Sequence, residues 1–471
     1  MNQEICDMSA AAMAAEIRAG RLSARETMAA HLARIDALNP TLNAIVTLHA
    51  EQALAAAAAA DEAQAQGKPL GPLHGLPVAH KDLFMTQGMR TTFGSKVHEH
   101  FVPSRSALLV ERQQAAGAIS IGKTNTPEFG AGSQTFNAVF GATRNPYDIS
   151  KTCGGSSGGS AVALATGMVA LADGTDMGGS LRCPANYCNI VGLRPSVGRV
   201  PEFPVQNGWG SLSVNGPMAR SVADLALYLS VLAGYDARDP LSISEDGAIF
   251  RAPLEADMRG KRIAWCPDFG GLPVDAEVAR VLDAQRRVFE DLGCIVEDAC
   301  PDFRDAHEIF MTLRAYAFEL QFGAILDRHP GMLKDTVVWN IEAGRKLSAP
   351  QLARAEKLRT ALFIRMHRFM ETFDAIVAPV NQVPPFDIDQ PYVDEIAGVK
   401  MENYIDWMRS CYLVSVTTHP AMSVPAGFTA GGLPVGIQLI GRHRGEWELL
   451  RMAGAFEAVN GTGRVRPRLD L

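Results

Sequence analysis

The chain has 471 residues, of which 47% are hydrophobic and 20% are charged, and its net charge is −7. This length is enough for a large core and more than one layer of structure. A negative net charge argues against a nucleic-acid-binding surface, which requires clustered Lys and Arg. Residues 1–20 lack a basic start followed by an apolar run, and no segment approaches the roughly 18 uninterrupted apolar residues of a spanning helix. We therefore expect a cytoplasmic protein with neither a nucleic-acid nor a membrane partner.

The eight cysteines form no C-x-x-C pair, which argues against zinc sites and thioredoxin-like chemistry. They are scattered through apolar surroundings in a long chain. We expect all of them to be reduced, buried thiols, and we expect no metal site. They are Cys6, Cys153, Cys183, Cys188, Cys266, Cys294, Cys300 and Cys411.

Residues 1–70 are expected to be helical and to decorate the core. Ser23-Ala24-Arg25-Glu26 is a capping box that begins a helix, and Gly20 ends the helix before it. We expect Asn39-Pro40 to stop that helix, because proline disrupts a helix interior. The alanine run at residues 55–60 favours a further helix.

From residue 71 onward, short apolar strands alternate with helices. We expect strands at residues 76–79, 118–122, 169–171, 262–265, 295–297 and 375–379, and helices at residues 160–167, 221–234 and 276–292. This alternation predicts an α/β fold with a mixed central sheet covered by helices on both faces. Residues 235–249 and 381–400 are expected to be surface loops.

Two glycine-rich stretches contain serines that indicate nucleophilic chemistry. Residues 154–160 include Ser156, and residues 174–182 include Ser180. Serine needs a group that removes its proton, and Lys81 can do so if burial lowers its pKa from about 10.4. With Ser156 carrying the proton between them, these residues predict an acyl-transfer enzyme that uses no histidine.

The turn that ends at Ser180 is the predicted oxyanion hole. Glycines let backbone N–H groups approach a reacting oxygen, because no Cβ lies in the way. Asp176 and Arg182 flank the turn, and we expect their side chains to pair and stiffen it. The predicted donors are the backbone N–H groups of Met177, Gly178, Gly179 and Ser180.

Motifs over most of the chain resemble those of the amidase signature family of serine amidohydrolases. They lie at residues 74–82, 121–129, 144–146, 154–161, 174–185, 192–196, 216–224 and 432–441. The resemblance implies Ser180 as the nucleophile, Ser156 after a cis peptide bond as the bridging serine, and Lys81 as the base. It also implies a mixed sheet enclosed by helices, and neither metal nor cofactor.

On this basis we expect an amidohydrolase that cleaves a small-molecule amide through an acyl-enzyme; a homodimer is compatible with these features. Ser157 is assigned a supporting role, and Gly130 and Ala131 are expected to contact the substrate. The expected organisation is a single amidase domain at residues 1–471, with helical decoration at 1–70, a catalytic core at 71–240 and a variable substrate region at 251–380.

Two positions depart from the family pattern. Met177 replaces the usual small hydroxyl residue, and Asn189 stands where glycine is common. Backbone donors survive a methionine, so the departure at Met177 concerns the shape of the acyl pocket beside Ser180. Five aromatic residues at partly helical spacing are a further pocket candidate, although such a stripe is more often core. They are Phe310, Tyr316, Phe318, Phe322 and Trp339.

Three other hypotheses remain open at this point. Residues 154–158 match the G-x-S-x-G nucleophile elbow, with Ser156 attacking in an esterase-like site, but the preceding residues do not resemble the required buried strand. Residues 117–124 match a P-loop, but their apolar middle resembles a strand. Within the family, the chain could be a glutaminase component of a tRNA-dependent amidotransferase, although Met177 and residues 134–140 look more like the stand-alone hydrolases.

Overall fold

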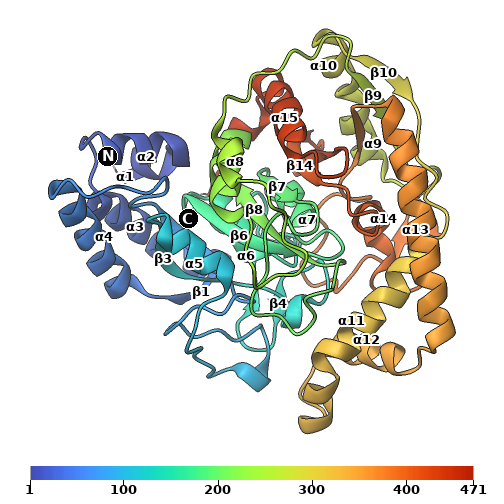
Figure 1. Cartoon of the computed structure of the whole chain (residues 1–471), viewed down its shortest axis with the longest axis horizontal. Helices are drawn as coiled ribbons and strands as arrows, with labels where there is room; N and C mark the ends of the chain where they lie inside the picture. Colours follow the sequence, from blue (N-terminus) through green and yellow to red (C-terminus); the bar gives the residue numbers. More distant parts are fainter. Residues whose placement is uncertain (1, 470–471) are drawn as a thin grey trace.

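The computed structural model describes residues 2–469, which fold around one large central sheet (Figure 1). Eleven strands follow the order β1-β3-β2-β6-β8-β7-β14-β15-β11-β9-β10. Parallel pairs such as β2–β3 stand beside antiparallel pairs such as β6–β8, which confirms the predicted mixed sheet. The strands are β1 (Ile45–Leu48), β2 (Pro77–Lys81), β3 (Ile119–Thr124), β6 (Leu171–Asp176), β7 (Val191–Arg194), β8 (Val214–Ala219), β9 (Arg262–Trp265), β10 (Ile295–Asp298), β11 (Ala375–Pro379), β14 (Ala421–Phe428) and β15 (Pro434–Ile440).

Helices cover both faces of this sheet, as predicted. Successive strand residues point to opposite faces, so Val78 joins one hydrophobic cluster and its neighbour Ala79 joins another. The helices are α1 (Asn2–Asp7), α2 (Ala10–Arg18), α3 (Ala24–Leu42), α4 (Ala50–Ala65), α5 (Leu108–Ala115), α6 (Gly158–Ala165), α7 (Arg182–Tyr187), α8 (Val222–Leu232), α9 (Ala276–Ala284), α10 (Arg286–Asp291), α11 (Ala306–Arg328), α12 (Asp335–Arg345), α13 (Ala349–Thr372), α14 (Arg409–Ser415) and α15 (Glu446–Asn460). Two short hairpins, β4 (Phe136–Asn137) with β5 (Gly141–Ala142) and β12 (Glu395–Ile396) with β13 (Val399–Lys400), lie outside the sheet.

The N-terminal region is more than decoration, because β1 pairs antiparallel with β3 at the edge of the sheet. The capping box at Ser23 is present as predicted. The expected stop at Pro40 was wrong, since α3 continues to Leu42 and ends at Asn43 in the left-handed conformation. The Asn39 side chain explains this, because its Oδ1 accepts the N–H groups of Ala44 and Ile45 at 2.9 and 2.8 Å and holds the end of the helix.

Two further expectations need correction. The strand expected at residues 169–171 instead runs from Leu171 to Asp176, because its polar half pairs with β8. The helix expected at 276–292 is divided at Gln285 into α9 and α10, since the Gln285 N–H donates to Leu282 in a tighter turn. The strands expected at 262–265 and 375–379 are confirmed.

The expectation of eight reduced thiols was also wrong, because Cys266 and Cys300 form a disulfide. Each cysteine lies just beyond one of two parallel neighbours, β9 and β10, which brings their Cα atoms to 4.9 Å. The other cysteines in the described part of the chain are free and buried.

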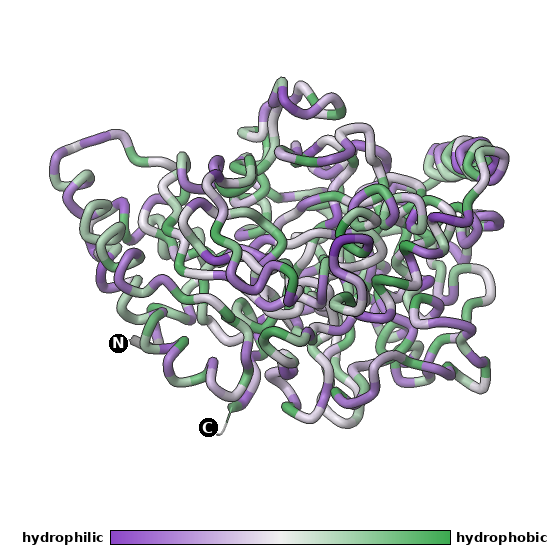
Figure 2. Tube along the Cα trace, turned by 90° about the horizontal axis from the view of Figure 1, so that it is seen from below, coloured by the Kyte–Doolittle hydropathy of each residue, from purple (hydrophilic) through white to green (hydrophobic). Residues whose placement is uncertain are grey.

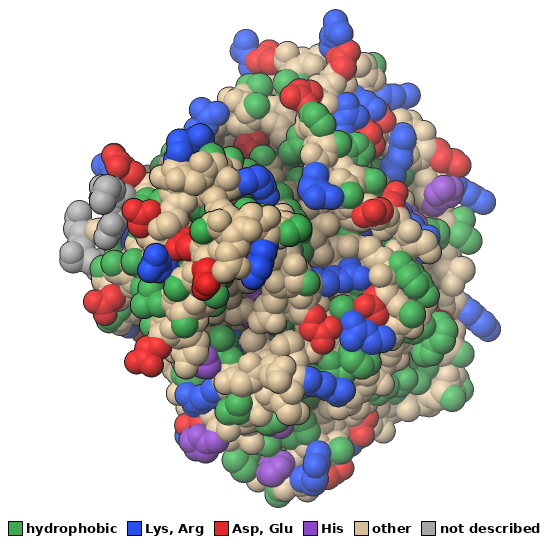
Figure 3. Space-filling model, turned by 60° about the vertical axis from the view of Figure 1, so that its left-hand side comes forward, with side chains coloured by type: hydrophobic (Ala, Val, Ile, Leu, Met, Phe, Trp, Pro, Cys, Tyr) green, Lys and Arg blue, Asp and Glu red, His purple; other side chains and the backbone are tan. Residues whose placement is uncertain are grey.

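The surface is mixed in character. On the face shown in Figure 3, Lys and Arg are interspersed with Asp and Glu, and in Figure 2 hydrophilic residues recur along the outlying loops and helices. Over residues 2–469, α11 alone is long and apolar enough to cross a membrane, a criterion that buried core helices also meet. Here α11 packs against α12 and α13.

Candidate active site

Lys81 ends β2 and is fully buried between β3 and β6. Its Nζ lies 2.7 Å from Ser156 Oγ, 3.0 Å from Ser157 Oγ and 2.9 Å from Thr175 Oγ1. Burial lowers the pKa of Lys81 to about 7, against the opposing effect of Asp176 and Asp173. The structure therefore brings Lys81, Ser156 and Ser157 together as predicted, with a lysine that is partly neutral near pH 7.

Sequence reasoning missed the residues that position Lys81. Asp173 on β6 accepts the Lys81 backbone N–H at 2.8 Å and contacts His80 Nδ1 at 2.7 Å. Thr175 follows two positions later and so faces the same side of the strand. The available signal was the alternation of the polar residues Asp173 and Thr175 along a buried strand. Gly174 between them made the segment resemble a turn.

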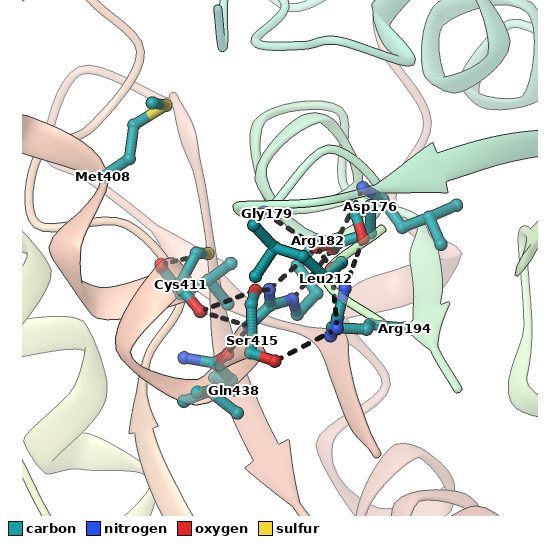
Figure 4. Close-up of polar contacts among 12 residues, drawn as sticks. Asp176, Gly179, Arg182, Arg194, Leu212, Met408, Cys411, Ser415 and Gln438 are labelled. Atoms are coloured by element: carbon teal, nitrogen blue, oxygen red, sulfur yellow. Dashed lines mark hydrogen bonds and ion pairs between the residues drawn. The ribbon is translucent and has the colours of Figure 1, made fainter. Parts of the chain in front are cut away.

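The turn that carries Ser180 is held by a buried ion network (Figure 4). The Asp176 carboxylate accepts Arg182 Nε and Nη2, both at 3.0 Å, which confirms the predicted pair. Arg194 contacts the same carboxylate at 3.4 Å and was not predicted. Burial alone would raise the pKa of Asp176, but the two guanidinium groups hold that pKa well below its ordinary value.

This network joins the turn to segments near the C-terminal end of the chain. Arg182 also donates to the Cys411 carbonyl at 3.0 Å and to Ser415 Oγ at 2.8 Å, both on α14 (Figure 4). It reaches Gln438 on β15 as well. The position of the turn therefore depends on segments more than 200 residues away in sequence.

One of the four predicted oxyanion donors is already engaged. The Gly179 N–H donates to Asp176 Oδ1 at 2.8 Å and is therefore not available in this structure. The N–H groups of Met177, Gly178 and Ser180 have no hydrogen-bond partner within residues 2–469. These three groups, and not Gly179, remain candidates for holding an oxyanion.

Ser180 and Ser156 line the same cavity, which has a volume of about 940 Å³. The Gly155–Ser156 peptide bond is cis, as the resemblance implied. No hydrogen bond joins the two serine hydroxyls in the described part of the chain. Catalytic hydrogen bonds are often long in unliganded enzymes, so the gap is compatible with a relay that closes when substrate binds.

Of the two residues expected to contact the substrate, Gly130 and Ala131, only the first lines the cavity. Gly130 lines the cavity, and a Cβ at this position would lie 3.5 Å from Ser156 Oγ. Ala131 does not line it, because its side chain is fully buried in an apolar cluster with Val337 and Ile341. The Ala131 side chain therefore lies away from the cavity, and the substrate contact expected for this residue stays a prediction.

The aromatic stripe divides between cavity and core. Tyr316, Phe318 and Phe322 on α11 line the cavity. Phe310 is buried and stacks on Tyr412 with ring centroids 4.2 Å apart, whereas Trp339 on α12 is exposed. Residues 313–329 thus contribute one wall of the cavity, and the substrate region expected at residues 251–380 stays a prediction.

The structure does not meet the conditions of the two rival motifs. The P-loop-like string is largely β3, and Lys123 is buried and donates to Phe84 O and Thr86 Oγ1. The residues before Ser156 form only isolated bridges, at Lys151 and Thr152, and not the strand of a nucleophile elbow. Among the described residues, no three His, Cys, Asp or Glu side chains are grouped to hold a metal ion.

Comparison with known proteins agrees with this fold and site. A model of the amidase family matches residues 26–450. An acylamidase from Rhodococcus erythropolis is 35% identical over 463 residues, which cover 98% of this chain and 97% of the relative. One component of the glutamyl-tRNA(Gln) amidotransferase from Chromohalobacter salexigens is 35% identical over 488 residues, which cover 98% of each chain. The crystal structure of a bacterial aryl acylamidase of the amidase signature family has a TM-score of 0.90 at 30% identity and covers 98% of this chain and 99% of that one.

A mixed sheet that carries a buried lysine, two serines that each follow a glycine and a cavity with an aromatic wall defines a serine amidohydrolase. The chain belongs to the amidase family and hydrolyses carboxylic amides at linear C–N bonds.

Proposed function

We propose that this chain is a stand-alone acylamidase in which Ser180 forms the acyl-enzyme, Ser156 relays the proton and Lys81 is the base. The observation that carries this proposal is the set of three hydroxyls around Lys81 Nζ. A neutral amine has two N–H donors and one lone pair. It can donate to Ser157 and Thr175 while its lone pair accepts the hydroxyl proton of Ser156, the partner at the shortest distance of 2.7 Å.

In the first half-reaction, Ser180 Oγ attacks the amide carbonyl carbon. Its proton moves to Ser156 Oγ as the Ser156 proton moves to Lys81 Nζ, so that lysine becomes an ammonium ion. The carbonyl oxygen becomes an oxyanion, which the N–H groups of Met177, Gly178 and Ser180 can stabilise. When the C–N bond breaks, the proton returns through Ser156 to the leaving nitrogen.

In the second half-reaction, water attacks the ester on Ser180. The same relay removes the proton of the water, and the bond between the acyl carbon and Ser180 Oγ breaks. The proton returns to Ser180 Oγ and the carboxylic acid leaves. Asp176 takes no proton in these steps, because Arg182 and Arg194 keep it ionised, and its role is to fix the turn.

A glutaminase component of a tRNA-dependent amidotransferase is the alternative within the family, because such proteins are among the relatives. Two features favour the stand-alone enzyme. Met177 lines the cavity close to Ser180 in sequence, and the cavity has an aromatic wall formed by α11. The chain is 35% identical to the Rhodococcus acylamidase and 35% identical to the amidotransferase component, so sequence identity does not distinguish the two functions.

The test is amide hydrolysis by the purified chain without a partner protein, ATP or tRNA. Aliphatic, aryl and amino-acid amides, glutamine among them, would be assayed for release of ammonia or amine. We expect several non-glutamine amides to be cleaved by the wild type and none by Ser180→Ala. Activity restricted to glutamine, and present only when host extract is added, would favour the amidotransferase component.

We further propose that the chain folds as a single domain, is located in the cytoplasm and forms a homodimer. The Cys266–Cys300 disulfide opposes a cytoplasmic location, because disulfides are rare in reducing compartments. Cell fractionation and light scattering of the purified chain would test the location and the oligomeric state.

A further inference from the structure

Arg314 on α11 is a buried cation that faces the cavity without an acidic partner. Its side chain lines the cavity, although only 4% of the residue is exposed. It donates to Asn340 Oδ1 at 3.0 Å, to Tyr404 Oη at 2.9 Å and to the Met177 thioether at 3.3 Å. All three acceptors are neutral, and no Asp or Glu among the described residues lies within ion-pair distance of Arg314.

Burying a guanidinium without a counter-charge is costly. Elsewhere the chain avoids this cost, since Arg182 and Arg194 share Asp176. Arg220 also lacks an ion pair among the described residues, but its Nη groups donate to the backbone carbonyls of Cys6 and Met8, and it does not line the cavity that contains Ser180. Arg314 therefore differs from Arg220 in combining an uncompensated, buried charge with a place at the cavity.

Arg314 has two Nη donors that no acceptor in the described part of the chain uses, and we call them the Arg314 fork. A guanidinium has five N–H donors. Asn340 takes the Nε donor, and Tyr404 and Met177 each take one Nη donor, the thioether being a weak acceptor. One N–H on each Nη then has no partner within residues 2–469. The two Nη atoms can thus still donate two hydrogen bonds, one for each oxygen of a carboxylate.

The guanidinium is also held in place near the nucleophile. Its carbon lies 4.5 Å from the ring centroid of Phe318, which limits its rotation. Its contact with Met177 places it next to the turn that carries Ser180. A carboxylate on Arg314 would therefore belong to a molecule that also reaches Ser180.

Other charged groups at the cavity favour an anion. Arg105, Arg328 and Arg359 line it as well. Of its carboxyl groups, Glu202 has its pKa raised to about 8 by burial and by the neighbouring Asp239, so it is largely neutral near pH 7. Glu356 is exposed at the rim. The cavity is thus positive in a chain whose net charge is −7.

We propose that Arg314 is a carboxylate-binding residue and that the preferred substrates are amides that carry a carboxylate. This inference rests on the proposed function and narrows its substrate class. The carboxylate can lie on the acyl fragment, as in a dicarboxylic acid monoamide, or on the amine fragment, as in an N-acyl amino acid. In both cases the Arg314 fork holds the carboxylate while Ser180 attacks the amide carbonyl.

Two matched pairs of amides test this proposal and separate the two sources. Glutaramate is compared with pentanamide for the acyl fragment, and N-butanoylglycine with N-propylbutanamide for the amine fragment. We expect kcat/KM to be higher for the charged member of at least one pair. Arg314→Gln should lower that value about 10–100-fold, as expected for losing charge-assisted hydrogen bonds, and change the neutral member less than about 3-fold. Arg314→Lys should restore part of the preference, since it keeps the charge without the fork.

Arg354→Gln is the matched control, because Arg354 is an exposed arginine on α13 that contacts Glu308 of α11 outside the cavity. It should leave the preference unchanged, and circular dichroism should show that each variant is folded. A neutral member preferred in both pairs, or a charge preference that survives in Arg314→Gln, would overturn the proposal.

Binding gives a readout that does not depend on turnover. Calorimetry with Ser180→Ala should detect glutarate or N-butanoylglycine, and adding Arg314→Gln should abolish that binding. If neither ligand binds, the carboxylate site is wrong. If a ligand binds through Arg314 but the wild type cleaves no amide in any panel, the proposed function fails while the carboxylate site stands.

Discussion

Replacing Asp176 by Asn tests whether the buried ion network fixes the Ser180 turn. The substitution keeps the side-chain volume but removes the negative charge shared by Arg182 and Arg194, both fully buried. It also turns an amide NH₂ toward groups that are all donors, among them the Gly179 N–H. Breaking a buried ion pair by removing one partner costs about 3–5 kcal/mol.

For 471 residues, an unfolding entropy of about 2.1 cal/mol/K per residue amounts to roughly 1 kcal/mol/K. Asp176→Asn should therefore lower Tm by about 3–5 °C in calorimetry. It should also lower kcat/KM for a neutral amide, because the turn loses its anchor. Asp257→Asn, at an exposed pair with Arg259, is the matched control and should leave Tm unchanged. A wild-type Tm in Asp176→Asn would refute the reasoning.

Three other measurements address the relay and the cavity. Protonated Lys81 cannot act as base, so kcat/KM for a neutral amide should rise about tenfold per pH unit below pH 7 and level off above it; a profile flat from about pH 6 to 10 would exclude this role. His80→Gln should cost less than the roughly 10³-fold typical of a lost catalytic base, because the ring nitrogens of His80 bond to Asp173 and Ser120 and not to a reacting group; a larger loss in kcat would give histidine a catalytic role. Met177→Thr should change relative kcat/KM values across acyl groups by about 1–3 kcal/mol, and unchanged selectivity would show that Met177 does not select the acyl group.

The local parts of the fold and site could be predicted from the sequence. Ser23 with Glu26 forms a capping box within four residues, and glycine clusters mark Ser156 and Ser180 because such turns need residues without a Cβ. Strand boundaries were less accurate where polar residues occupy a buried strand. At β6, the predicted strand stopped at residue 171 because Asp173 and Asp176 are polar, and their partners, Lys81 and Arg194, come from other segments.

The remaining features depend on contacts between distant segments. Arg314 meets Met177 across 137 positions, and nothing near Arg314 in the sequence distinguishes it from a surface arginine. The Cys266–Cys300 disulfide forms because β9 and β10 are neighbours in the sheet. The residues of the two strands alone do not reveal that they pair. The engagement of the Gly179 N–H by Asp176 likewise required the folded turn.

Labelling with a serine-reactive fluorophosphonate, followed by peptide mass spectrometry, tests the central claim most directly. The account predicts one labelled residue, Ser180, and no labelling in Ser180→Ala. It also predicts that Lys81→Ala slows the labelling, because the relay then lacks its base. Labelling at Ser156, or undiminished labelling of Ser180→Ala, would contradict the assignment of Ser180 as the nucleophile.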